Sequence, residues 1–389
     1  MLTALIAILL APFAVLTAFF VVEVAAGLRP NKARSVAGRP PSAVVVVPAH
    51  DEAGVIGETL QRLDSALGER MRMLAVADNC ADSTAAEARQ EGAEVLERHD
   101  SERRGKGFAL QFAADHLADD PPDVFVVLDA DCAIDGASLR ALVDEAARSG
   151  RPCQSINLLR ADRSASPLVQ LSTFAFMLKN LVRQRGLQRL AGRVHLTGTG
   201  MAMPFGLFRA SGQVHSSIVE DLALGLELAE AGHPSKLVSD AFVWSSGSNE
   251  KGTLTQRRRW EGGFIATALR QGPKLIRRAI TRGDFRALFA GLDLLVPPLA
   301  LFAILNLAAL IVATLLTFVL GAETWPLVTH VALLGVAGLA LFLAWLGEGR
   351  KFVTLSALAR VPLYVLWKLP LYLGFARRGA PEEWLRSGR

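Results

Sequence analysis

Long apolar segments at both ends of this 389-residue chain restrict what it can fold into. The first covers residues 2–28 and is interrupted only by Glu23. At 1.5 Å per residue, a helix of this length crosses the roughly 30 Å hydrocarbon core of a bilayer. Two further apolar runs cover 288–320 and 325–346. The sequence therefore predicts one amino-terminal and two carboxy-terminal transmembrane helices.

Basic residues predict how these helices are oriented. No Lys or Arg precedes the first run, whereas four follow it, at Arg29, Lys32, Arg34 and Arg39. By the positive-inside rule, the amino terminus lies outside and the next segment lies in the cytoplasm. The same pattern argues against a cleaved signal peptide, whose basic end comes first. We expect a multi-pass protein of the inner (cytoplasmic) membrane, with its central domain facing the cytoplasm.

The last apolar stretch, 352–375, differs because it contains prolines and the charged residues Arg360 and Lys368. Its tyrosines and tryptophan are residue types that favour the membrane interface. We expect a helix pair at the inner membrane surface; the alternative is a third carboxy-terminal span. The expected organisation is a transmembrane helix at 1–28, a cytosolic domain at 29–284, two transmembrane helices at 285–351, and interfacial helices with a cytosolic tail at 352–389.

Composition excludes several classes of protein. Hydrophobic residues make up 51% of the chain, which rules out disorder over most of its length. The net charge of +5 selects no partner by itself. Cys80, Cys132 and Cys153 have no CxxC spacing and are too few for a disulfide scaffold or a zinc cage. We expect reduced thiols in a cytosolic domain.

The central part of the chain alternates strand-like and helix-like patterns. Continuous apolar runs, each followed by an amphipathic segment, occupy 43–47, 73–77 and 124–128. This alternation predicts an α/β fold with a mostly parallel sheet covered by helices on both faces. Ligands bind such sheets at the carboxyl ends of the strands. The residues that follow each run are therefore the candidates for chemistry.

Acidic residues follow all three runs: Asp51 and Glu52, then Asp78 and Asp82, then Asp129 and Asp131. A single acid at a strand end is often a helix cap, and this alternative stays open for Asp51 and Asp82. Asp129 and Asp131 supply the hard oxygen ligands that Mg²⁺ or Mn²⁺ prefers, with phosphate oxygens completing the shell. The alternative is that the triplet Asp129, Ala130, Asp131 is only a turn after a buried strand.

Later segments add further candidates. Lys106 lies in a Gly-rich basic loop that suits a phosphate, although a solvated loop has the same composition. Asp221 follows Glu220 at the start of a helix, where an acid either serves as a general base or complements the helix dipole. Trp260 ends the run Gln256, Arg257, Arg258, Arg259, which either binds diphosphate and a sugar or is a basic membrane-proximal helix.

The order of these motifs resembles the membrane-bound family 2 glycosyltransferases, a group that includes cellulose, hyaluronan and other exopolysaccharide synthases. The matching segments are PAHDE at 48–52, DNCADST at 78–84, KGFAL at 106–110, DAD at 129–131, GTGM at 198–201, VED at 219–221 and QRRRW at 256–260. The resemblance implies a GT-A fold, with the sugar nucleotide at the carboxyl edge of the sheet. Asp51 and Val219 depart from the family, which usually has Asn and Thr there.

The resemblance also implies residue roles. Asp221 corresponds to the base that deprotonates the acceptor. The donor nucleotide is assigned to Glu52, Asp78, Lys106 and Asp129, and the metal to Asp131 with Asp129. The diphosphate and the acceptor are assigned to Gly198, Thr199, Gly200, Glu220, Gln256, Arg259 and Trp260.

The implied enzyme is a metal-dependent, inverting hexosyltransferase that uses a nucleotide-diphosphate sugar, with a UDP-sugar as the expected donor. The small membrane part favours a lipid-linked or glycolipid acceptor, in exopolysaccharide or glycolipid synthesis. A processive polysaccharide synthase is the alternative within this class. A nucleotidyltransferase or a non-catalytic membrane scaffold is the alternative outside it. No nucleic acid partner is expected.

Overall fold

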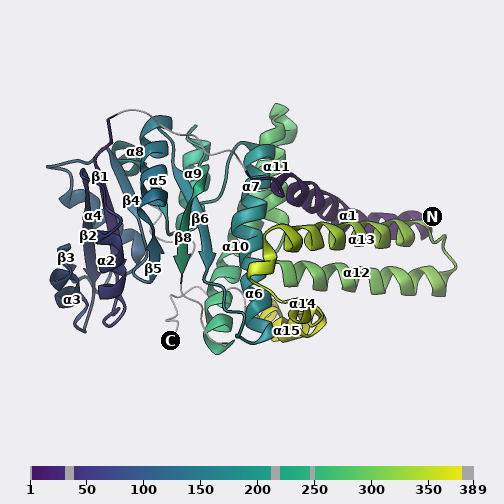
Figure 1. Cartoon of the computed structure of the whole chain (residues 1–389). Helices are drawn as coiled ribbons and strands as arrows, with labels where there is room; N and C mark the ends of the chain where they lie inside the picture. The colour runs from purple at the N-terminus through teal and green to yellow at the C-terminus, as the bar shows by residue number, and fades with distance from the viewer. Residues whose placement is uncertain (1, 31–38, 212–219, 246–249, 379–389) are drawn as a thin grey trace. The chain divides into compact units, whose positions relative to one another are not determined.

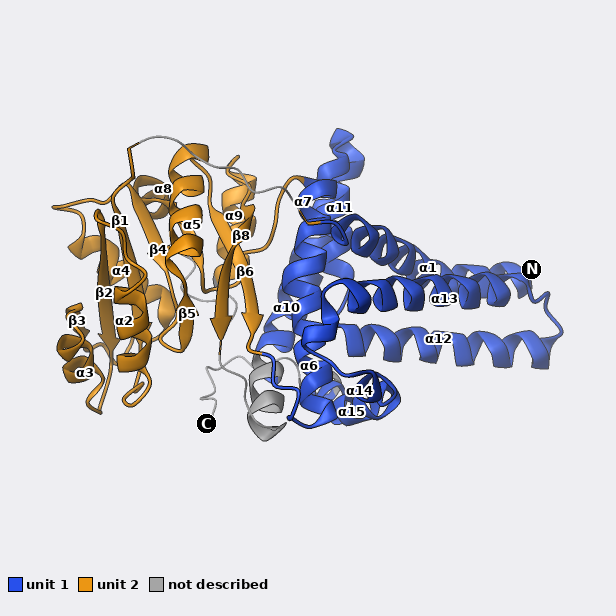
Figure 2. Ribbon diagram, viewed as in Figure 1, with its two compact units in different colours: residues 1–29, 161–191, 248–389 blue, residues 30–160, 192–247 orange. Residues whose placement is uncertain are grey.

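The computed structural model describes residues 2–30, 39–211, 220–245 and 250–378, except for the side chains of 220, 250–257, 259, 376 and 378. The chain forms two compact units, which Figure 2 distinguishes by colour. Unit 1 consists of 1–29, 161–191 and 248–389, and unit 2 of 30–160 and 192–247. Segments 161–191 and 248–284, which the sequence analysis assigned to the domain 29–284, cluster with the apolar helices.

Unit 2 is built on an eight-stranded sheet in the order β3-β2-β1-β4-β7-β6-β8-β5. Its strands are β1 (Ala43–Ala49), β2 (Met71–Asp78), β3 (Glu94–Arg98), β4 (Val124–Val127), β5 (Cys132–Ile134), β6 (Cys153–Leu159), β7 (Met201–Pro204) and β8 (Lys236–Ser245). β1 pairs in parallel with β2 and β4, and β2 with β3. The three predicted strands are therefore confirmed, and their carboxyl ends share one edge of the sheet.

The other half of the sheet is mixed. β7 runs antiparallel to both β4 and β6, β6 is parallel to β8, and β5 is antiparallel to β8. Within the glycine-containing segment 194–203, a strand forms only from Met201. Gly198 and Gly200 have φ angles of +80° and +58°, a conformation that cannot continue a strand.

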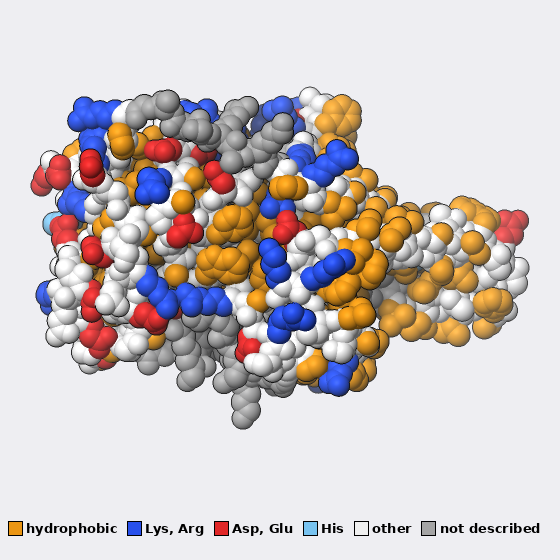
Figure 3. Space-filling view, in the orientation of Figure 1, with side chains coloured by type: hydrophobic (Ala, Val, Ile, Leu, Met, Phe, Trp, Pro, Cys, Tyr) orange, Lys and Arg blue, Asp and Glu red, His pale blue; other side chains and the backbone are white. Residues whose placement is uncertain are grey.

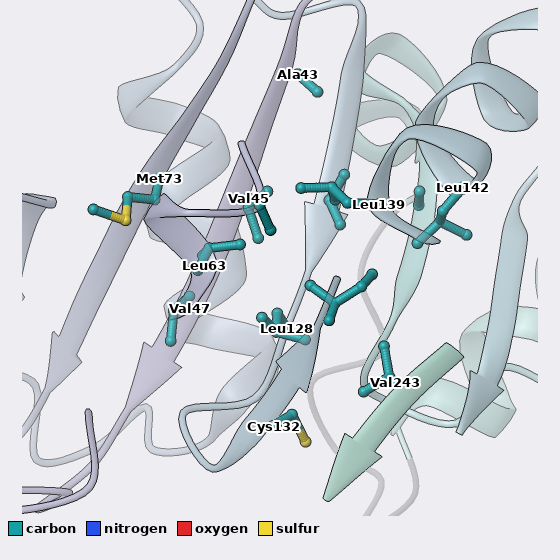
Figure 4. Packing of buried hydrophobic residues seen from close by; sticks show 14 of the residues in the cluster. Ala43, Val45, Val47, Leu63, Met73, Leu128, Cys132, Leu139, Leu142 and Val243 are labelled. Atoms are coloured by element: carbon teal, nitrogen blue, oxygen red, sulfur yellow. The ribbon is translucent and has the colours of Figure 1, made fainter. Parts of the chain in front are cut away.

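Helices cover both faces of the sheet (Figure 1). They are α2 (Ile56–Asp64), α3 (Thr84–Gln90), α4 (Lys106–His116), α5 (Gly136–Ser149), α8 (Phe205–Ala210) and α9 (Glu220–Glu230). On one face, α2 and α5 place Leu63, Leu139 and Leu142 against β1 and β4 (Figure 4). On the other face, residues of α4, α8 and α9 form one apolar cluster with alternate residues of β1, β2 and β4, including Val44 and Leu74. This burial on both faces explains why β1 and β4 are apolar at every position.

Unit 1 is helical in the part that the structure describes. Its elements are α1 (Leu2–Gly27), α6 (Pro167–Met177), the π-helix η1 (Leu178–Arg183), α7 (Gln184–Ala191), α10 (Glu250–Arg282), α11 (Phe285–Leu295), α12 (Leu299–Leu320), α13 (Trp325–Gly347), η2 (Gly349–Lys351), α14 (Leu355–Leu358) and α15 (Val361–Arg378). Three of them, α1, α12 and α13, are long and apolar enough to cross a membrane. Many of their apolar side chains are exposed, as the face drawn in Figure 3 shows.

The run 288–320, predicted as one span, consists of two helices. α11 ends at Leu295 and α12 begins at Leu299. Pro297 and Pro298 separate them because proline has no amide donor and disfavours the helical conformation of the residue before it. The spanning helix is therefore α12 alone.

Buried charged residues join helices of unit 1. Arg183 donates to Glu23 of α1 (2.6 Å) and to Asp293 of α11 (2.6 Å), and all three are buried. In α15, Lys368 is fully buried and donates to Glu261 of α10 at 2.7 Å. This pairing compensates the cost of burying the Lys368 charge. The helix pair predicted in 352–375 is present as α14 and α15, and its place at the membrane surface stays a prediction.

Candidate active site

The carboxyl ends of β1, β2 and β4 are adjacent because these strands are neighbours in the sheet. Two residues at these ends, Asp51 and Asn79, have positive φ angles of 50° and 54°. This conformation is uncommon for residues other than glycine, and Asn and Asp adopt it more readily than most. It turns the chain sharply after each strand. The acidic residues that follow the strands therefore gather at one edge.

Asp78, at the end of β2, is held by a buried arginine. Arg98 Nη1 donates to Asp78 Oδ1 at 2.6 Å, and only 9% of each side chain is exposed. Asn79 Nδ2 donates to the same oxygen at 3.0 Å. Arg98 also donates to Asp100 and to the carbonyl oxygen of Arg103, which ties the basic loop to the sheet. Asp78 is thus a fixed carboxylate at the predicted nucleoside position.

The turn after β1 is fixed by the loop that follows β2. The backbone N–H of Glu52 donates to Thr84 Oγ1 (2.8 Å), and that of Ala53 donates to Asp82 Oδ2 (3.1 Å). Burial tends to raise the pKa of Asp82, but its hydrogen bonds from Thr84 and Ala53 outweigh this and lower it. Asp82 also accepts from the Thr84 backbone N–H at the start of α3, although the N-cap residue of that helix is Ser83. Asp82 therefore fixes the chain beside Glu52.

Lys106 connects three of the predicted site residues. Its ammonium contacts the Asp129 carboxylate and donates to the carbonyl oxygen of Gly198 at 2.6 Å. A Cβ atom at Gly198 would lie 3.1 Å from Asp221 Oδ2 and 3.5 Å from Lys106 Nζ. Thr199 Oγ1 accepts from the backbone N–H of Asp129 at 3.0 Å. The structure therefore brings Lys106, Asp129, Gly198 and Asp221 together.

Asp221 has one oxygen held by its own helix. The Leu222 backbone N–H donates to Asp221 Oδ1 at 2.8 Å, while Oδ2 is the oxygen nearest Gly198. Gly200 cannot be replaced without displacement, since a Cβ there would lie 2.0 Å from Ser155 Oγ. Because they have no side chain, Gly198 and Gly200 allow their loop to lie close to Asp221 and Ser155.

A divalent metal fits the donor set that the structure presents. Oxygens of Asp129 and Asp131 and the Sγ of Cys132 lie within 4.8 Å of one another. Burial, together with the charges of Asp131 and Asp129, raises the pKa of Cys132 well above its ordinary value, so the thiol stays protonated. The thiol donates toward Asp131 at 3.4 Å rather than acting as a ligand. Two carboxylates remain, which suit Mg²⁺ or Mn²⁺.

The last motif belongs to unit 1. Trp260 lies in α10 and packs on Phe176 of α6, with ring centroids 5.7 Å apart. The side chains of Glu220, Gln256 and Arg259 lie outside the described residues, although their backbone is helical. Their predicted roles stay predictions.

Arg98 is the site residue that the sequence analysis missed. It lies directly opposite Asp78 in the parallel pairing of β2 and β3. The strand EVLER is too polar to resemble the other buried strands, so no apolar run indicated it. If β3 had been predicted as a strand, the arginine at its carboxyl end would have indicated that Arg98 belongs to the site.

A family model described as "Glycosyltransferase like family 2" matches residues 40–263, more than half of the chain. The chain belongs to the family 2 glycosyltransferases. The match extends from the start of β1 into α10 and includes each predicted site residue. The predicted family is thereby confirmed.

The first of two similar solved structures supports the same fold. A mannosyltransferase from Pyrobaculum calidifontis, in complex with GDP-Man and Mn²⁺, is similar with a TM-score of 0.56 and 18% identity, covering 97% of this chain and 95% of that one. A glucosyl-3-phosphoglycerate synthase from Mycobacterium tuberculosis, with Mn²⁺, UDP-glucose and phosphoglyceric acid, has a TM-score of 0.37 and 18% identity over 54% of this chain and 76% of that one. No curated sequence matches the chain significantly. This family 2 glycosyltransferase has the predicted GT-A fold, together with helices apolar enough to span a membrane.

Proposed function

We propose that this glycosyltransferase moves a hexose from a nucleotide-diphosphate donor, a UDP-sugar, to a membrane-held acceptor, with inversion at the anomeric carbon. The observation that carries the proposal is the contact of Lys106 with both Asp129 and Gly198, next to Asp221. The Lys106 cation and the carboxylate of Asp129 are therefore in contact. Asp131 lies beside Asp129, and Asp221 lies beside Gly198. This is the set of charges that displacement of a nucleoside diphosphate needs.

The donor side of the site follows from the carboxyl edge of β1, β2 and β4. Asp78, oriented by Arg98, and Glu52, positioned through Thr84, bind the nucleoside. Lys106 neutralises donor phosphate charge, since its three donors can contact phosphate as well as Asp129. Asp129 and Asp131 would hold Mg²⁺ or Mn²⁺, which when bound supplies positive charge against the diphosphate. Arg259 is proposed to contact the same diphosphate.

Asp221 acts as the general base. The Leu222 amide holds one of its oxygens at 2.8 Å, which leaves the carboxylate oriented toward the Gly198 loop. Its other oxygen accepts the proton of the acceptor hydroxyl, and the acceptor oxygen attacks the anomeric carbon on the face opposite the leaving diphosphate. The bond to the diphosphate breaks in the same displacement. No covalent enzyme intermediate forms, and an α-linked donor gives a β-glycoside.

The membrane helices support a membrane-held acceptor, such as a lipid-linked oligosaccharide or a glycolipid. In the described part of the chain, three helices are long and apolar enough to span a membrane, which is few for a channel that exports a polymer. Trp260 offers an aromatic plane on which a sugar can stack. We place the protein in the inner membrane with unit 2 facing the cytoplasm, since Arg29 and Arg39 follow α1.

A donor screen on native membranes tests the proposal. Release of nucleoside diphosphate from UDP-sugars and GDP-sugars, compared between wild type and Asp221→Asn, identifies the donor. The variant should bind the donor with near-unchanged affinity and lose about 10²-fold or more in rate. Product length on a gel separates a single transfer from processive synthesis. A variant with wild-type turnover would show that another residue is the base.

A further inference from the structure

The bend between α10 and α11 in unit 1 exposes a combination of side chains that the transfer reaction does not use. Leu269, Ile280 and Phe285 are 68%, 78% and 72% exposed. Arg270, Lys274 and Arg277 are exposed beside them. We call these six residues the elbow surface.

The elbow surface has a strong positive charge. Between residues 262 and 292 the chain has six Lys or Arg and one acid, Asp284, so the net charge is six minus one, or +5. Asp284 is already engaged: it caps α11 by accepting from the Ala287 amide and lies 3.8 Å from Arg278. Within the described part of the chain, no ion pair is found for Arg270, Lys274 or Arg277. Their charge therefore faces outward uncompensated.

The apolar and basic side chains occupy adjoining faces of α10. Leu269, Pro273 and Ile280 recur at spacings of four and seven residues and share one face, with the three cations next to it. A different face of α10 packs closely on α11, because a Cβ at Gly272 would lie 2.9 Å from the Leu295 side chain. The elbow surface is thus the amphipathic face that the helix pair leaves uncovered.

The position of the elbow surface next to a membrane span indicates what covers it. α11 ends at Leu295 and the spanning helix α12 begins at Leu299, so the bend is one short helix away from the bilayer. α10 runs crosswise to α12 and α13 (Figure 1), as a helix in the plane of the membrane surface would. Apolar side chains flanked by Lys and Arg suit the boundary between acyl chains and headgroups.

We propose that the elbow surface lies in the headgroup layer and binds anionic phospholipids. Leu269, Ile280 and Phe285 insert at the level of the first acyl carbons, and the cations contact lipid phosphates. Anionic lipid is preferred over zwitterionic lipid because the surface charge is uncompensated. This inference does not depend on the proposed transfer reaction.

Lipid retention tests the inference without measuring activity. The full chain is reconstituted into nanodiscs of phosphatidylcholine mixed with phosphatidylglycerol, and the lipids retained after detergent re-extraction are quantified by mass spectrometry. The test variant is Lys274→Gln with Arg277→Gln, which removes two charges and keeps most of the apolar stems. The matched control, Arg140→Gln with Arg209→Gln, removes two exposed charges from unit 2.

Wild type and control should enrich phosphatidylglycerol, and the test variant should lose most of that enrichment. A cation near an anionic surface contributes about 1 kcal/mol, or about fivefold, so two cations change the preference by up to about 25-fold. Lys274→Arg with Arg277→Lys should keep the enrichment, which guards against a loss caused by misfolding. Equal enrichment in the test variant and the control would overturn the proposal. Loss of dimers in the test variant, with lipid unchanged, would also overturn it in favour of a second copy of this chain.

Discussion

Gly198→Ala is predicted to slow transfer by displacing the carboxylate proposed as the base. The added Cβ would lie 3.1 Å from Asp221 Oδ2, so the carboxylate must move by a few tenths of an ångström. It would also lie 3.5 Å from Lys106 Nζ, which is ordinary contact. Because misplacement by about 1 Å can reduce a rate on the order of 10²-fold, we expect a loss of about tenfold in kcat. Donor affinity should change less than kcat.

The backbone adds a second, separable cost. Gly198 has a φ of +80°, and an alanine there costs about 1–2 kcal/mol of stability. Gly206→Ala is the matched control, since its Cβ meets nothing within 4 Å and its φ is not positive. Nucleoside diphosphate release measures kcat, calorimetry measures donor affinity, and thermal unfolding measures stability. A folded Gly198→Ala variant with wild-type kcat would refute the idea that catalysis depends on where Asp221 lies.

Three further predictions concern the metal, the nucleoside site and the cysteines. Turnover should require Mg²⁺ or Mn²⁺ and be abolished in Asp131→Asn, which lacks the charge that holds a hard cation; full activity in excess chelator in a metal titration would contradict this. Arg98→Gln should cost about 3–5 kcal/mol in thermal unfolding, because it leaves Asp78 buried without its partner, and donor binding should weaken with it. At pH 8, peptide mass mapping should show that maleimide modifies Cys80 before Cys132 and Cys153, because Cys132 and Cys153 are buried. Burial also raises the pKa of Cys153 to about 12, which keeps its thiol protonated.

The parallel half of the sheet could be predicted from sequence because a strand that is buried on both faces has a continuous run of apolar residues. β1, β2 and β4 all contain such a run. β3 and β5 do not, since β3 is an edge strand with charged residues at Glu94, Glu97 and Arg98, and β5 has only three residues. Strand order and the antiparallel pairings depend on contacts between distant segments. No local pattern encodes them.

The candidate site shows the same division. The acids after β1, β2 and β4 could be predicted to meet because parallel strands end at one edge. The contact of Lys106 with Gly198 joins residues 92 positions apart, and only the folded loop shows it. The break at Pro297 was visible in the sequence, but high apolar content on both sides concealed it. Apolar content determines whether a helix can enter a membrane, whereas proline determines where it ends.

The buried triad of Glu23, Arg183 and Asp293 has a consequence for how this protein is made. Glu23 is synthesised 160 residues before the arginine that neutralises it, and Asp293 follows 110 residues after that. At roughly 5–20 residues per second, the ribosome needs on the order of 8–30 s to supply Arg183. Until then, Glu23 of the first helix has neither of the residues that it meets in the folded protein. An unrelated helix of equal hydropathy in place of α1 would remove this interval, but it would leave Arg183 paired with Asp293 alone.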